Sequence, residues 1–282
     1  GMSGGSRRKV VRDTTKLKAV HRKRVLREGE ASPPPKFDRA RYPEKVLELA
    51  RLGWQALLDS EFESVVIAGW MTSALARMGA PLDVLGAFGR IVEDEVRHVD
   101  LCSDVVWALG GTPTISDRAV PPFPGWKEDQ QEEAEAEAIV GLTAFFCVGE
   151  LVSNFLLRQA EMMASEPIAT WALGEIVRDE AFHGPWGFET ARLFVPAWSE
   201  ERKKRLVARL LDECARLEKR LGGPLPPTAE RPPTKAEEQL AALGLPGPAP
   251  LLAVFYQAIE TQLVPRMKDL GVDLPLGVGQ AS

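Results

Sequence analysis

A five-residue motif, Asp-Glu-x-x-His, occurs twice in this chain, at residues 94–98 and 179–183. The chain has three histidines, and two of them end these motifs. On an α-helix, a glutamate and a histidine three residues apart share one face, so a carboxylate and an imidazole can bind one metal ion together. Two such helices could hold a pair of ions between them. The candidate ligands are Glu95, His98, Glu180 and His183.

Four ligands do not complete a site for two ions, so we expect one inward carboxylate from each of two further helices. Glu150 stands alone in the apolar run 145–152, where a carboxylate is costly to bury unless it is paired or bound to metal. The first helical segment offers two candidates, Glu61 and Glu63. Glu61 continues the apolar stripe that passes through Trp54, so we favour Glu61.

The sequence around these two glutamates is also repeated. Residues 61–64 and 150–153 both read Glu-x-x-Ser. Glu61 precedes the first motif by nearly the same interval as Glu150 precedes the second, and a helical rise of about 1.5 Å per residue brings each pair back to a similar level. The chain therefore reads as a duplication, with a glutamate followed by Asp-Glu-x-x-His in each half.

Long helical segments broken by glycine and proline account for most of the chain, and strand signals are almost absent. A proline-rich stretch at residues 112–128 separates two helical pairs and is long enough to run back along a helix. This order predicts an all-α fold, a four-helix bundle with one long crossover and additional C-terminal helices. The expected helices cover about residues 43–78, 82–109, 129–164, 167 onward, 199–221, 235–243 and 250–270.

We divide the chain into a basic N-terminal arm (1–40), the bundle (41–197) and a C-terminal helical extension packed on the bundle (198–282). The first 30 residues hold ten basic and three acidic residues, a net charge of +7 that leaves −12 on the rest. A basic tail can contact nucleic acid or acidic partners. We favour the simpler expectation of a solvated arm, without nucleic acid as a partner.

The cysteines and the hydropathy of the chain predict the cellular compartment of the protein. Cys102, Cys147 and Cys214 are odd in number and form no Cys-x-x-Cys pair, which excludes a rubredoxin-type iron site or a zinc ribbon. We find no signal peptide and no run of about 18 apolar residues. We therefore expect a cytoplasmic protein without a membrane partner.

The six-ligand pattern resembles that of the ferritin-like di-iron carboxylate proteins, in which two helices give one glutamate each and two give Glu-x-x-His. The likeness covers about residues 43–195 and implies that the all-α fold is a ferritin-like four-helix bundle. The segments 79–81 and 94–98 are also similar to a group of bacterial ferritin-like proteins with no assigned role. The resemblance implies two iron ions, or a Mn/Fe or Mn pair. It makes Glu95 and Glu180 the bridging ligands, with the terminal ligands Glu61, His98, Glu150 and His183.

The aspartate of each motif has an implied role as well. A metal-bound imidazole usually donates its second N–H to a carboxylate, which fixes the ring. By the resemblance, Asp94 would hold His183 and Asp179 would hold His98. The alternative is an ordinary surface aspartate on each helix. The neighbouring arginines at positions 97 and 178 would neutralise these aspartates or be solvated.

Three local features limit the reactions expected at the metal site. The remaining histidine, His21, lies in the basic tail, so a third imidazole ligand is not expected. Cys102 stands where the radical-forming reductases carry tyrosine, which argues against a tyrosyl radical. Gly184-Pro185 directly follows a ligand and predicts a kink or bulge. That defect would open an apolar pocket near Phe146, Cys147 and Phe182, or would only solve a packing problem.

Three function classes remain. The first is an oxidase or oxygenase that activates O₂ and acts on a small organic substrate, with an unidentified electron donor. The second is ferroxidase activity with iron storage in a shell, and the third is a structural bundle with a vestigial site. Chain length, the basic arm and the C-terminal helices argue against a cage. We favour the first class, in a monomer or homodimer.

Overall fold

The structure is a computed structural model that describes residues 6–10, 17–27, 32–119, 139–223 and 232–275. Almost all regular structure in these residues is helical, which confirms the all-α prediction. The chain forms two compact units. The first comprises Gly1–Phe123, Ala164–Ile176 and Glu238–Leu245, and the second comprises Pro124–Met163, Val177–Glu237 and Pro246–Ser282. Helix α6 (Pro167–Phe194) starts in the first unit and ends in the second.

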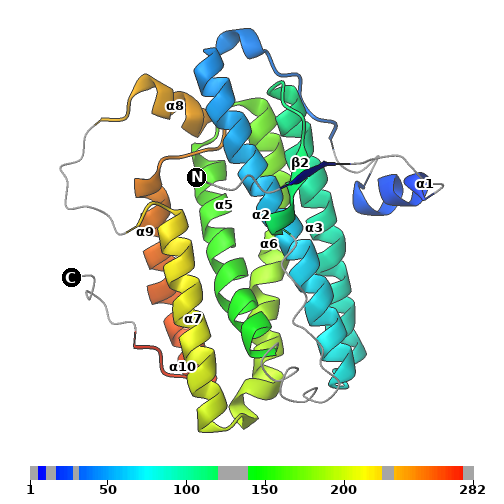
Figure 1. Ribbon diagram of the computed structural model, residues 1–282, viewed down its shortest axis with the longest axis vertical. Coiled ribbons are helices and arrows are strands. Elements are labelled where there is room, and N and C mark those ends of the chain that lie inside the picture. The colour runs from blue at the N-terminus through cyan, green and yellow to red at the C-terminus, as the bar shows by residue number, and fades with distance from the viewer. Residues whose placement is uncertain (1–5, 11–16, 28–31, 120–138, 224–231, 276–282) are drawn as a thin grey trace. The chain divides into compact units, whose positions relative to one another are not determined.

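The first unit is built on a helical hairpin. Helices α2 (Glu44–Arg77) and α3 (Leu82–Ala108) lie side by side along their length (Figure 1). Pro43, in an extended conformation, precedes α2, and Glu44 places an acid in the first turn, where the helix dipole favours it. Gly79 ends the helix at φ +72°, a conformation that favours glycine. Both helices have the bounds that the sequence predicts to within about one residue.

A distant segment covers the start of this hairpin. Helix α8 (Lys235–Ala242) leads into residues 243–245, and the fully buried Trp54 donates its indole N–H to the Leu243 carbonyl at 2.9 Å. Gly244 has φ +80°, and a Cβ there would lie 2.8 Å from Leu173. A glycine is therefore required where this segment passes between α2 and the first turns of α6.

Part of the N-terminal arm belongs to the first unit. Strand β1 (Arg7–Lys9) pairs antiparallel with β2 (Thr114–Ser116), and the short helix η3 (Asp117–Ala119) follows. Between β1 and α2 the chain forms the helical turn α1 (Lys18–Val20) and the π-turn η1 (His21–Val25), which packs against α3. The short helix η2 (Arg39–Arg41) then leads into α2. These arm residues are held on the first unit although most of them are exposed, and the proline-rich stretch that separates the helical pairs contains β2 and η3.

The second unit is built around an apolar helical run on which other helices pack. Residues 139–144, the π-turn η5 (Phe145–Glu150) and α5 (Leu151–Met163) are helical without interruption. Helix α9 (Pro248–Ala258) packs on α5, and α7 (Glu200–Arg220) packs on η5 (Figure 1). The remaining elements are η6 (Val195–Ala197), η7 (Ile259–Leu263) and α10 (Val264–Asp269). The predicted start of the third helix, near residue 129, lies outside the described residues.

One helical run among the described residues, Ile139–Met163, is long and apolar enough to cross a membrane, with a mean hydropathy of 1.8. This run corrects our expectation that no segment reaches the length of about 18 apolar residues that a membrane span needs. A buried core helix passes the same test, and 67% of the window is buried in the structure. The run is therefore weak support for a membrane span.

The expected bulge at Gly184-Pro185 is absent, because α6 stays α-helical through Pro185, and the expected kink stays a prediction. Proline frees the carbonyl four residues earlier, on Ala181, and both residues lie on the exposed side, where water can satisfy that carbonyl. The irregular backbone lies instead in η5 of the same unit. A Cβ on Gly187 would approach the Phe146 carbonyl oxygen to 2.7 Å, so this glycine allows α6 and the π-turn to pack closely.

This contact predicts unequal effects of alanine at two glycines on one helix. Gly187→Ala should lower the free energy of unfolding by about 1–3 kcal/mol, because the methyl group meets backbone atoms that cannot rotate away. At Gly184 no atom lies within 4 Å of the added carbon, so Gly184→Ala should leave stability unchanged or raise it by about 0.5–1 kcal/mol. Urea denaturation measures both, and equal losses would contradict the packing argument.

Candidate metal centre

Three of the predicted ligands meet in the first unit. Glu61 comes from α2, and Glu95 and His98 come from one face of α3. The Nδ1 atom of His98 lies 3.2 Å from Glu61 Oε2 and 3.3 Å from Glu95 Oε2. Glu61 is 6% exposed, Glu95 1% and His98 0%. We call these residues the first trio; each offers one ligand atom, and those atoms lie within 4.8 Å of one another.

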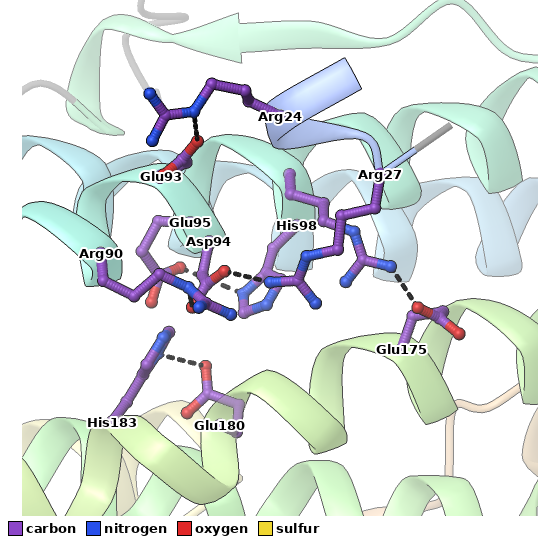
Figure 2. A network of polar contacts seen from close by, with 11 residues as sticks. Arg24, Arg27, Arg90, Glu93, Asp94, Glu95, His98, Glu175, Glu180 and His183 are labelled. Carbon is purple, nitrogen blue, oxygen red and sulfur yellow. Dashed lines mark hydrogen bonds and ion pairs between the residues drawn. The ribbon is translucent and has the colours of Figure 1, made fainter. Parts of the chain in front are cut away.

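The other three predicted ligands meet in the second unit and form the second trio. Glu150 ends the π-turn η5, while Glu180 and His183 lie one turn apart on α6. His183 Nδ1 is 3.3 Å from Glu180 Oε1, a contact drawn in Figure 2, and 3.8 Å from Glu150 Oε2. These ligand atoms also lie within 4.8 Å of one another, and all three side chains are buried.

Each unit thus gathers the three residues that one copy of the repeated pattern assigns to it. Of the two glutamates considered on α2, Glu61 is the buried one that contacts the histidine, while Glu63 is only half-buried. The arrangement is a buried carboxylate–imidazole cluster whose donor types fit a divalent metal ion. The role of the six residues as ligands stays a prediction.

The π-turn is a feature of the second trio that the sequence analysis missed. Five of its six residues, Phe146 to Glu150, are buried, and it ends on the ligand candidate. Single π-turns within α-helices occur often at functional sites, because the extra residue re-aims the side chains that follow. Gly149 within the run was the one local signal of an irregular backbone.

Asp94, which precedes Glu95, is 1% exposed and contacts two arginines (Figure 2). Arg27 Nη2 donates to Asp94 Oδ1 at 2.6 Å, and Arg90 Nε donates to Asp94 Oδ2 at 2.7 Å. The spacing of Arg90 and Asp94, four residues on one helix, could have been read from the sequence. The contact from Arg27 could not, because the two residues are far apart in the chain.

The predicted Asp94–His183 and Asp179–His98 pairs each join residues of different units, and both stay predictions. Asp179 is buried, as Asp94 is, so neither residue is an ordinary surface aspartate.

Arg97, which precedes His98, is buried rather than solvated. It is 1% exposed, and it forms a very close ion pair with Glu175, on the first part of α6. The burial of Arg97 excludes the solvated alternative for this residue, while Arg178 is exposed. His21, the third histidine, lies 2.8 Å from Asp100 in the arm and belongs to neither trio.

The cysteines are free and buried. Burial raises the pKa of the Cys102 thiol well above its ordinary value, and the negative charges of Glu61 and Glu95 raise that pKa further. A thiolate at this position is therefore disfavoured, and the first trio offers oxygen and nitrogen ligands beside a neutral thiol. Burial likewise raises the pKa of Cys147, in the π-turn, and raises that of Cys214 to about 12.

A surface pocket of about 730 Å³ lies in the first unit, away from the trio. It lies at the start of α2, and its lining includes Arg39, Tyr42 and Gly110. The predicted apolar pocket near Phe146 and Cys147 stays a prediction. Both of these side chains are buried, and the ring of Phe182 packs 5.5 Å from that of Trp186.

No protein-family model matches this chain, and no curated protein matches it. The likeness to ferritin-like proteins therefore rests on the residues of the repeated motif and on their placement within each unit.

The buried ion pair predicts a strong contrast between two glutamates of α6 that each pair with an arginine. Glu175→Ala should lower the free energy of unfolding by about 3–5 kcal/mol, because it leaves the Arg97 guanidinium buried without its carboxylate. The matched variant Glu189→Ala should cost less than about 1 kcal/mol, because Glu189 and Arg192 are 59% and 53% exposed. Thermal or urea unfolding measures both, and equal costs would refute this reading of Arg97.

Proposed function

We propose that the two trios together hold two divalent metal ions, and that the protein is a dinuclear oxidoreductase of ferritin-like architecture. The observation that carries the proposal is the recurrence, once in each unit, of a buried Glu, Glu-x-x-His trio whose ligand atoms converge. The two trios consist of residues that the sequence repeat already groups together. A chance clustering would not be expected to follow that repeat.

Charge supports a metal ion in each trio. Two carboxylates approach the same imidazole nitrogen, at 3.2 and 3.3 Å in the first trio and at 3.8 and 3.3 Å in the second. Like charges held this close in a buried site are costly, and a neutral imidazole does not compensate them. A divalent cation would balance the two carboxylates and accept the imidazole as a third ligand.

The donor types favour iron or manganese. Each trio has two carboxylates and one imidazole, and the nearby thiol of Cys102 is held neutral by burial and by the carboxylate charges. Oxygen-rich sets of this kind suit Fe(II) and Mn(II), whereas Cu(I) and structural zinc favour thiolate ligands. We propose two iron ions, with a Mn/Fe or Mn pair as the alternative.

We propose that Glu95 and Glu180 are shared by the two metals, with the other four residues as terminal ligands. Asp94 and Asp179 would then orient the opposite histidines.

We propose that the centre serves oxidation of a small organic substrate by O₂. Bound iron would supply the redox chemistry, and the protein would hold it in a buried, carboxylate-rich site. The basic arm and the C-terminal helices favour this proposal over storage in a shell, because such additional segments would hinder the assembly of a symmetric cage. We accordingly propose a monomer or homodimer, in a reducing compartment that keeps the three thiols free.

The metal ligands can be tested with a matched pair on α2. After anaerobic loading with Fe(II), native mass spectrometry should find about two ions per chain. Glu61→Gln should weaken Fe(II) binding at least about tenfold, because it removes a ligand charge, and Glu63→Gln should change little. The double variant His98→Ala with His183→Ala should bind almost none. Full metal content in the double variant would refute the proposal.

Iron loading in air separates the oxidase from a storage protein. With excess Fe(II) and O₂, the protein should retain about two irons per chain, since the six predicted ligands form one closed centre. Gel filtration should give a monomer or dimer, and an oxygen electrode should record O₂ uptake that the histidine double variant lacks. A soluble ferric core in a large multi-subunit shell would overturn the oxidase reading.

A further inference from the structure

A short basic segment of the arm, residues 17–27, binds α3 on both sides of the first trio. The arm segment contains five basic residues and no acidic one. Its His21 lies 2.8 Å from Asp100, beyond His98, and Arg24 lies 3.6 Å from Glu93, before Glu95. Both contacts are partly exposed. They place the cationic arm segment along the part of α3 that carries two of the three trio residues.

The third contact of the arm segment reaches the interior. The Arg27 guanidinium binds the buried carboxylate of Asp94, the residue immediately before Glu95 (Figure 2). Arg27 is also the one described non-glycine residue at positive φ, +50°. A residue with a side chain adopts this conformation only where the surrounding contacts hold it there. The pairing with Asp94 provides such a contact, so the conformation of the arm depends on the charge at this point of α3.

We propose that docking of the arm segment and metal binding at the first trio oppose each other. The inference rests on the proposed metal site. A divalent ion held by Glu95 would bring two positive charges close to the Arg27 guanidinium and to the other cations of the arm segment, and their repulsion would weaken docking. Because such coupling is reciprocal, the docked arm segment must lower metal affinity by the same factor that metal lowers docking. The arm thus limits metal loading.

The structure offers a matched pair of variants for the test. Arg27→Ala removes the contact with Asp94, and Arg24→Ala removes the same charge from the same segment but loses only the partly exposed contact with Glu93. Co(II), which O₂ does not oxidise as readily as Fe(II), is titrated into each full-length protein by calorimetry. Arg27→Ala should bind Co(II) about tenfold more tightly than the unaltered chain, and Arg24→Ala should differ less than about threefold. Arg27→Lys, which keeps the charge, should restore most of the unaltered affinity.

Limited trypsin digestion of the same proteins reports docking directly. Cleavage after Arg22, Lys23 or Arg24 should accelerate several-fold when Co(II) is added to the unaltered chain. In Arg27→Ala it should be fast with and without Co(II). Cleavage after Lys219 or Arg220, at the end of α7 in the second unit, serves as the internal reference and should not respond to the variant.

The outcomes separate the two proposals. Equal Co(II) affinities in Arg27→Ala and Arg24→Ala, weaker binding in Arg27→Ala, or protection of the arm segment by Co(II) would each overturn the antagonism while leaving the metal site standing. If no variant binds Co(II), and Fe(II) is not bound either, the metal site fails and this inference fails with it. A circular dichroism spectrum and melting curve establish that Arg27→Ala is folded before its affinity is compared.

Discussion

Burial of carboxylates is the constraint that the rest of the first unit has to meet. An ionised carboxylate in an apolar interior needs an opposite charge. In the part of this unit that the structure describes, each buried acid outside the trio contacts a basic side chain: Arg27 and Arg90 for Asp94, Arg97 for Glu175, Arg41 for Glu166 and His21 for Asp100. The arm, α3 and the loop before α2 are thereby joined through charge as well as through apolar packing.

The two halves of the repeat reach similar trios by different backbones. In the first unit both contributing segments are regular α-helix, and the carboxylate of Glu61 comes within 3.2 Å of its histidine. In the second, Glu150 is presented by a π-turn, and its nearest approach to His183 is 3.8 Å. Two ions held in these sites would therefore not be equivalent, and we expect them to differ in affinity and in ease of oxidation.

The sequence predicted the helices well because their ends are chemically marked. Gly79 and Pro81 separate α2 from α3, and Ser199 caps α7 by accepting a hydrogen bond from the Arg202 N–H at 3.3 Å. The trios were also predictable, since a helix of 3.6 residues per turn fixes which side of α3 carries Glu95 and His98. These features depend on neighbours in the chain, which a single sequence records.

The missed features depend on partners far apart in the chain. Nothing near Arg27 indicates that its side chain ends on Asp94, and nothing near residues 7–9 indicates a strand partner at 114–116. The π-turn before Glu150 packs closely against Gly187 of α6, which is distant in the chain. Composition shows that the arm is basic, but only the three-dimensional contacts show that its basic side chains bind acidic residues of α3.

The two-stranded ribbon of β1 and β2 limits how far the arm segment could move after its release from α3. It fastens Arg7–Lys9 to Thr114–Ser116, with Arg7 also bound to Asp59 on α2 at 2.7 Å. The eight residues between Lys9 and Lys18 extend to no more than about 30 Å, so a released arm segment stays within that radius of the ribbon. Its effective concentration near α3 is then on the order of millimolar. Re-docking is consequently independent of how dilute the protein is.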